Sequence, residues 1–121
     1  MRVLICGGRT LSPAKVCVWL HMNASRVLGT LPEAVIYGGA PGGDEGVEQW
    51  AAAAGIPVEV YRADWREYGK AAGPIRNRRM LTEGKPDVVL ALPGGIGTRN
   101  MVELAETDGV RVIKVTLELC A

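Results

Sequence analysis

Apolar residues along the chain fall into short runs that alternate with longer amphipathic stretches. Residues 2–6 form a nearly continuous apolar run, and residues 87–92 are the most apolar segment, which is typical of strands buried on both faces. Residues 57–61 alternate between apolar and polar, as a half-buried strand does. The pattern predicts five strands, at residues 2–6, 34–37, 57–61, 87–92 and 111–115.

The stretches between these strands predict helices, because apolar residues recur every three or four positions and capping residues mark the ends. Ser12 and Pro13 are expected to begin the first helix, Asp44 to cap the second, Pro74 to open the third and Thr98 to cap the fourth. The helices are expected to end at Gly29, Gly55, about Thr82 and Gly109. The predicted buried stripes are Val16, Leu20, Ala24 and Val27 in the first helix, and Val47, Trp50, Ala51 and Ala54 in the second.

Strands and helices alternate strictly, which predicts a parallel sheet with right-handed crossovers and helices on both faces. The expected fold is therefore α/β, a three-layer Rossmann-like doubly wound sheet of about five strands, with residues 1–121 forming a single domain. Such sheets bind ligands at the carboxyl ends of their strands, where the strand order reverses. Three glycine-rich segments follow strands and are expected to meet there: residues 7–10, 38–44 and 93–98.

Residues 93–98, with the sequence PGGIGT, join a predicted buried strand to a helix. Glycines let bare N–H groups approach a ligand, and a helix N-terminus carries about half a positive charge, so this segment predicts a phosphate cradle. The alternative is a tight turn in which Thr98 is the helix cap. The glycines at positions 94, 95 and 97 exceed what a turn requires, which favours the cradle.

Residues 38–44, with the sequence GGAPGGD, have the glycine spacing of a P-loop. Asp44 stands where a P-loop has its phosphate-binding lysine, and a carboxylate there would repel a triphosphate, which argues against an ATPase. Gly38, Ala40 and Gly43 also match a weak dinucleotide-binding fingerprint, placed after the second predicted strand instead of the first. Asp44 is expected either to accept ribose hydroxyl groups or to serve as an ordinary helix cap, and the sequence leaves both open.

The one long connection, residues 62–73, leads into the third helix. Connections of about a dozen residues inside a compact domain are usually functional. Lys70 and Arg76 are predicted to bind phosphate oxygens, as a point charge and as a bidentate guanidinium. Trp65 and Tyr68 are candidates for stacking on a base, with a buried lid or a subunit contact as the alternative.

Charge is unevenly distributed along the chain. The formal net charge is only +1, which argues against DNA, RNA or an anionic membrane as a partner. Between Arg62 and Arg79, however, six basic and two acidic residues give a local charge of +4 that would attract a compact anion. Arg78 and Arg79 themselves are expected at the solvated surface. This local charge is the one feature favouring a binder of single-stranded DNA, the least favoured class.

The cysteine and histidine residues argue against several classes of functional site. Cys6, Cys17 and Cys120 are odd in number and lack paired spacing, which argues against a disulfide framework and a zinc site. His21 is the only histidine, so a Ser-His-Asp triad and histidine-based metal sites are excluded. The chain opens directly on a strand, and no apolar run approaches the ~20 residues that span a bilayer. A soluble cytoplasmic protein without a metal or cofactor is expected.

Three segments carry a family resemblance: YGGA at residues 37–40; Asp64 and Trp65 with YGKAAGPIRN at 68–77 and Met80; and PGGIGT at 93–98. With these residues the chain resembles the YspA-like branch of the SLOG superfamily. That Rossmannoid group also contains the Lonely Guy phosphoribohydrolases, the lysine decarboxylase-like proteins and DprA. The resemblance covers nearly the whole chain and implies a five-stranded domain that binds nucleotides or nucleotide-derived ligands. It also implies a homodimer, and several relatives act as sensors in defence or phage-encoded systems.

Lonely Guy enzymes cleave the N-glycosidic bond of nucleoside monophosphates with an arginine of Arg-Lys-x-x-Met and a glutamate of Pro-Gly-Gly-x-Gly-Thr-x-x-Glu. Arg76 and Met80 match the first segment, with Asn77 in place of the lysine. The glutamate position is Met101, which cannot transfer a proton, and Glu103 lies about 200° further round the helix. A phosphoribohydrolase is therefore the alternative function, with Arg76 and Asp44 as its catalytic candidates.

The preferred prediction is a ligand-binding or sensor domain for a small nucleotide-type molecule. The predicted ligand-binding residues are Gly7, Gly8, Arg9, Thr10, Gly38, Gly39, Ala40, Gly43, Asp44, Lys70, Arg76, Asn77, Pro93, Gly94, Gly95, Gly97 and Thr98.

Overall fold

The computed structural model describes residues 1–116, so Cys120 and the end of the expected domain lie outside the described residues. The strands are β1 (Arg2–Cys6), β2 (Ala34–Tyr37), β3 (Val58–Val60), β4 (Val88–Ala91) and β5 (Arg111–Lys114). The helices are α1 (Pro13–Leu28), α2 (Gly43–Ala54), α3 (Trp65–Tyr68), the 3-10 turn η1 (Gly69–Ala71), α4 (Ala72–Gly84) and α5 (Ile96–Thr107). Every predicted strand is present, with its ends within about one residue of the expected positions.

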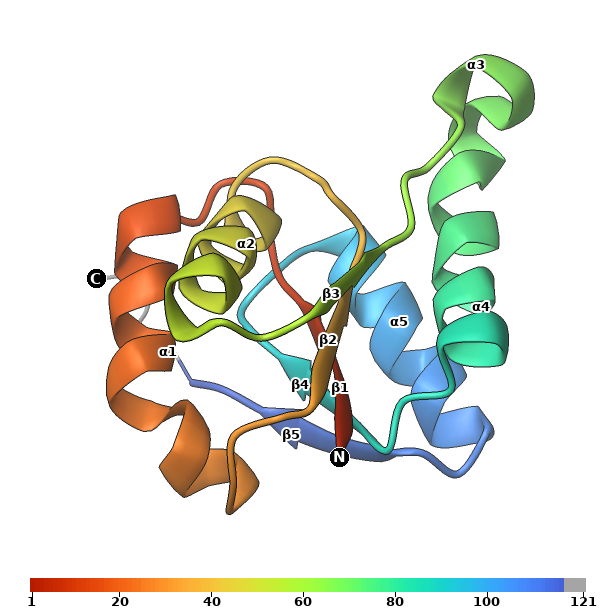
Figure 1. The fold of residues 1–121 in the computed structure, drawn as a ribbon. Helices are drawn as coiled ribbons and strands as arrows, with labels where there is room; N and C mark the ends of the chain where they lie inside the picture. Colours follow the sequence, from red (N-terminus) through yellow and green to blue (C-terminus); the bar gives the residue numbers. More distant parts are fainter. Residues whose placement is uncertain (117–121) are drawn as a thin grey trace.

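The strands form one parallel sheet in the order β3-β2-β1-β4-β5. Helices α1 and α2 pack together on one face and α4 and α5 on the other (Figure 1). This arrangement confirms the predicted α/β, three-layer, Rossmann-like fold. From β1 the chain first builds the sheet outward through β2 and β3, then crosses to the other side for β4 and β5. The strand order therefore reverses between β1 and β4.

The two faces of the sheet bury separate hydrophobic clusters. Val3 and Ile5 of β1 belong to the cluster under α1 and α2, where Trp50 is fully buried. Leu4 belongs to the cluster under α4 and α5, together with Met101. Alternate side chains of β1 thus pack against helices on opposite faces of the sheet, because successive side chains of a strand point to opposite faces. Within residues 1–116, no helix has the length and apolar character needed to cross a membrane.

Helix α1 follows its prediction closely. The Ser12 hydroxyl accepts a hydrogen bond from the Lys15 N–H at 3.3 Å, and Gly29 ends the helix in the left-handed conformation with φ of 84°. The predicted stripe differs at two positions: Val27 is only half-buried, and Ala54 of α2 is exposed. Ala54 is the last residue of its helix.

Two helices begin before the residues expected to cap them. Helix α2 starts with Gly42 at its N-cap position, and α5 starts with Gly95 there. Asp44 and Thr98 therefore lie inside the first turns, and the prediction that they cap is wrong. Glycine takes the N-cap position at little conformational cost, and at Gly42 the backbone has a φ of 78° that strongly favours it.

The long connection and the helix after it also differ from expectation. Helix α4 begins at Ala72, two residues before Pro74, which was expected to open it. A proline is tolerated at this position, since the N–H groups of the first turn have no intrahelical partner. The helix continues to Gly84. Residues 62–71, called the arm below, include α3 and η1, neither of which buries a residue. The arm projects beyond the sheet layers at the free end of α4 (Figure 1).

Candidate functional site

A pocket of about 840 Å³ lies at the carboxyl edge of the sheet, where the loops after β1, β2 and β4 meet the start of α4. All the predicted ligand-binding residues line it except Gly39 and Gly43. The pocket therefore lies where a doubly wound sheet places a ligand, at the reversal of strand order. Its volume falls within the range of about 300–1,000 Å³ that is usual for small-molecule sites.

Backbone hydrogen bonds tie the three loops together. The Gly8 N–H donates to the Pro93 carbonyl at 2.9 Å, and the Gly43 N–H donates to the Gly8 carbonyl at 3.0 Å. A Cβ on Gly8 would lie 3.0 Å from the Gly94 Cα, and one on Gly43 would lie 3.3 Å from the Gly7 Cα. A side chain at Gly8 or Gly43 would thus crowd the backbone of a neighbouring loop, which favours glycine at both positions.

Gly95 and Gly97 differ from these structural glycines. A Cβ at either position would meet no atom within 4 Å, both residues are exposed, and neither has a positive φ. Gly94, by contrast, leaves no room for a side chain, because a Cβ there would collide with the Thr98 hydroxyl. Gly95 and Gly97 leave the first turn of α5 uncovered on the pocket side, where the N–H groups of a helix lack intrahelical partners.

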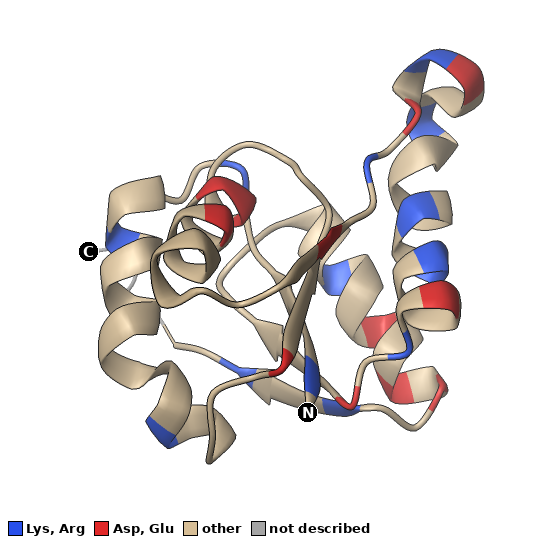
Figure 2. Ribbon diagram, in the orientation of Figure 1, with Lys and Arg blue, Asp and Glu red and all other residues tan. Residues whose placement is uncertain are grey.

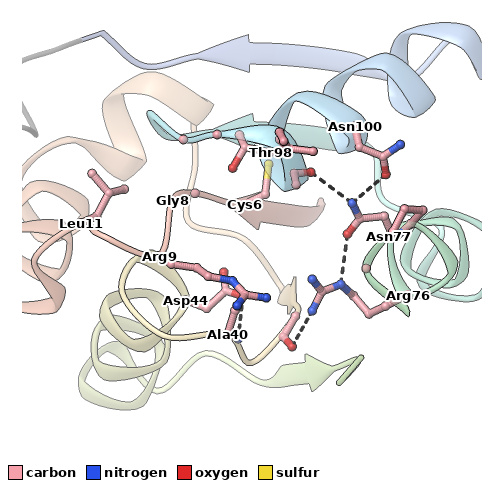
Figure 3. A pocket seen from close by; sticks show the side chains of 18 of the residues that line it. Cys6, Gly8, Arg9, Leu11, Ala40, Asp44, Arg76, Asn77, Thr98 and Asn100 are labelled. Atoms are coloured by element: carbon pink, nitrogen blue, oxygen red, sulfur yellow. Dashed lines mark hydrogen bonds between the residues drawn. The ribbon is translucent and has the colours of Figure 1, made fainter. Parts of the chain in front are cut away.

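Arg76 reaches from α4 across the pocket to the end of β2. Its Nη1 donates to the Gly38 carbonyl at 2.9 Å, and its Nε donates to the Asn77 side-chain oxygen at 3.0 Å (Figure 3). A Cβ on Gly38 would collide with the guanidinium, which explains the glycine there. Burial lowers the pKa of Arg76, while the neighbouring Asp44 charge opposes that shift. Within residues 1–116, no hydrogen bond occupies Nη2, so this edge of the guanidinium is available to a ligand.

Asn77 holds α4 and α5 together beside the pocket. Its amide nitrogen donates to the Gly97 carbonyl at 3.1 Å and to the Asn100 side-chain oxygen at 3.0 Å, while its own oxygen accepts from Arg76 (Figure 3). Only 3% of the residue is exposed. The structure therefore makes Asn77 a residue that positions both Arg76 and the first turn of α5, and its contact with a ligand stays a prediction.

Asp44 lies in the first turn of α2 with 6% of the residue exposed. Its Oδ2 accepts a hydrogen bond from the Ala40 N–H at 3.0 Å, which closes the loop after β2. Burial raises the pKa of this carboxyl group, and the Ala40 N–H and the Arg76 charge offset only part of the shift. The carboxyl group lines the pocket, so its predicted contact with ribose hydroxyls is compatible with its position.

Basic residues predominate around the pocket. Arg9, Lys70 and Arg76 line it, against Asp44 as its acidic residue, and further basic residues occur along α4 (Figure 2). Such a lining favours anionic ligands. Arg78 and Arg79 lie outside it, as predicted, and form exposed ion pairs with Asp108 and Glu83.

Comparisons with known proteins agree with the fold. The family model described as the YspA, cpYpsA-related SLOG family matches residues 1–68. The chain belongs to this SLOG family. The gene 61 protein of Mycobacterium phage D29 is 35% identical over 119 residues, which cover 93% of the chain and 94% of the phage protein.

The fold of this SLOG protein also resembles part of a larger solved structure. UDP-GlcNAc 2-epimerase from Neisseria meningitidis, solved with UDP-GlcNAc bound, aligns with a TM-score of 0.55 and 17% identity over 95% of the chain. The chain spans 32% of the length of the epimerase. At this identity the likeness supports the Rossmann-like fold and nothing finer.

The SLOG chain lacks the glutamate that the resemblance to Lonely Guy enzymes would place in the site. Met101 stands there, fully buried in the cluster under α4 and α5. Glu103 is exposed and does not line the pocket, as its position on the helix predicted. Within residues 1–116, no group of three or more His, Cys, Asp or Glu side chains could hold a metal ion.

Sequence reasoning missed several residues that line the pocket. One of them is Ile96, which stands between two glycines and lines the pocket. Its side chain is 83% exposed and does not pack into the hydrophobic core. Cys6 ends β1 beneath the pocket, and burial raises the pKa of its thiol to about 12, so the thiol is protonated and a poor nucleophile near neutral pH. The other pocket residues outside the prediction are Ile5, Leu11, Gly73, Pro74, Met80 and Asn100, whereas Trp65, a predicted stacking candidate, does line the pocket.

Proposed function

We propose that the pocket binds a nucleotide or a nucleotide-derived metabolite, with a phosphate group seated on the first turn of α5 beside Arg76. The observation that carries the proposal is the open space at Gly95 and Gly97, where an added Cβ would meet no atom within 4 Å. A phosphate placed there meets N–H groups and the positive end of a helix dipole. Family membership and the Rossmann-like fold are consistent with such a ligand.

Arg76 supplies the second half of the phosphate site. Its Nη1 and Nε are already held by Gly38 and Asn77, which orients the remaining edge of the guanidinium. A guanidinium that is fixed before binding loses little side-chain entropy when it meets a phosphate. Asn77 bonds to both Arg76 and the Gly97 carbonyl, so the two halves of the phosphate site are linked directly.

Asp44 is assigned to the sugar of the ligand. It lies in the first turn of α2, which follows β2 on the other side of β1 from β4 and α5, and it lines the same pocket. A carboxylate accepts hydrogen bonds from hydroxyl groups and repels phosphate. The sugar of the nucleotide therefore lies at Asp44, and its phosphate lies at the first turn of α5.

A charge placed in the cradle tests the phosphate site. Gly95→Asp is expected to weaken binding by about 100-fold or more, because like charges about 4 Å apart near a protein surface repel by about 4 kcal/mol. Calorimetry against nucleoside mono- and diphosphates and ADP-ribose derivatives measures this. Thr107→Asp, at the exposed far end of the same helix, adds the same charge and should leave the affinity within about twofold. Failure of the wild-type protein to bind any of these compounds, or undiminished binding by Gly95→Asp, would contradict the proposal.

A second candidate function, a nucleoside 5'-monophosphate phosphoribohydrolase, is favoured by Asp44 alone. The raised pKa of this buried carboxyl group in a pocket suits a general acid or base. Incubation with nucleoside monophosphates followed by chromatography of free base distinguishes the two functions. Binding without hydrolysis is expected, whereas base release that is lost in Asp44→Asn would establish the enzyme.

A further inference from the structure

Trp65 is an exposed aromatic residue that faces the pocket from the arm. Its exposed fraction is 48%, although the Arg9 guanidinium already lies over the ring with its central carbon 5.1 Å from the ring centroid. About half of this large aromatic residue therefore stays open to solvent while it lines the pocket.

The ring is held in place from two sides. Arg9, from the loop after β1, covers it through a cation–π contact. Gly73, at the start of α4, lies against its edge, where an added Cβ would come within 3.3 Å of the Trp65 Cη2. An exposed ring that is positioned by two separate segments differs from a surface residue that is free to change rotamer.

A core-packing role does not account for this tryptophan. Helix α3 buries none of its residues, whereas Trp50 of α2 is fully buried. Tyr68, one turn further along α3, is equally exposed at 46% but does not line the pocket. The two exposed aromatic residues of the arm are thus separated by the structure, with only Trp65 directed to the site.

We propose that Trp65, oriented by Arg9 and Gly73, is the stacking platform for the base of the bound nucleotide. This inference rests on the function proposed above and adds the place of the base. Stacking on an aromatic ring accepts every base, because each has a π face, so the subsite selects for a planar ring and discriminates little among bases. Arg9 on the indole leaves a cation beside the base, where it also favours an anionic ligand.

The test compares ligands with and without a base. Ribose 5-phosphate and the 5'-monophosphates of adenosine, guanosine, cytidine and uridine are titrated by calorimetry into the wild-type chain, Trp65→Ala, Trp65→Phe and Tyr68→Ala. At least one nucleotide is expected to bind the wild-type chain about 5- to 100-fold more tightly than ribose 5-phosphate. Trp65→Ala should lose this advantage while keeping its affinity for ribose 5-phosphate, and Trp65→Phe should retain much of it.

Tyr68→Ala is the matched control and should keep the wild-type preference. Folding of each variant is checked by circular dichroism, and the exposure of Trp65 means that its removal creates no buried cavity. Equal affinity of the wild-type chain for ribose 5-phosphate and every nucleotide, or a preference that survives in Trp65→Ala, would overturn the stacking subsite alone. Absence of binding by ribose 5-phosphate and all four nucleotides would overturn the phosphate site, and the subsite with it.

Discussion

Single residues in this pocket show that its glycines serve different purposes. Gly8 and Gly94 are small because neighbouring atoms occupy the place of a side chain. Gly95 and Gly97 are small although nothing in the described chain fills the space around them. The sequence PGGIGT does not separate the two kinds, and only the second kind points to a ligand.

Asp44 makes the stability of the ligand-free protein depend on pH. Burial raises its pKa in the folded state, so the folded chain holds this proton more tightly than the unfolded chain. Stability from this group is therefore present below the ordinary pKa of an aspartate and is lost as the pH rises through the raised value. Asp44→Asn should increase the thermal midpoint at pH 7, and the gain should shrink as the pH approaches 4.

The control for this prediction is Glu103→Gln, which removes an exposed carboxylate from α5. Its midpoint should follow the wild-type curve at both pH values. Asparagine retains an oxygen for the Ala40 N–H, so the loop after β2 keeps its hydrogen bond. A lower midpoint for Asp44→Asn at pH 7 would show that the ionised carboxylate stabilises the loop more than its burial costs.

At the scale of elements, Asn77 connects α4 to α5 beside the pocket. Asn77→Ala removes hydrogen bonds to Arg76, Gly97 and Asn100 from a site where only 3% of the residue is exposed. Leaving buried polar groups unpaired costs about 1–3 kcal/mol, so the free energy of unfolding should fall by about that amount in urea titrations. Ligand affinity should also fall, by about tenfold, because Arg76 loses its orientation.

Asn100→Ala is the comparison for Asn77→Ala, since it removes only the side-chain contact between the two asparagines. Its loss of stability should be clearly smaller, and Arg76 should keep its place. Equal losses in the two variants would mean that Asn77 does not connect the helices as described.

The elements themselves could be read from the sequence more readily than their contacts. The strands and the first helix carry strong local patterns, so their positions were predicted closely. The starts of α2 and α5 were not, because each of these helices begins after a glycine at its N-cap, and neither glycine carries a side chain that would mark a cap in the sequence. The arm and the pairing of Asn77 with Asn100 depend on segments far apart in the chain, which no local pattern encodes.

At the scale of the whole molecule, the sheet brings loops from both sides of β1 to the same pocket. The loop after β2 comes from one side of β1 and the loop after β4 from the other, so one ligand can contact both. The net charge of only +1 does not indicate that basic residues gather at the pocket. Their clustering is seen in the charge of residues 62–79 and in the fold. The homodimer implied by the family resemblance stays a prediction.

Gly8 is hydrogen-bonded to the loops on both sides, and this has a kinetic consequence. The conformational entropy of these loops is lost when the chain folds, so a ligand meets a rim that is already assembled. Stopped-flow mixing should therefore give one exponential phase whose rate rises linearly with ligand concentration. A rate that levels off would reveal a slow rearrangement before or after the encounter.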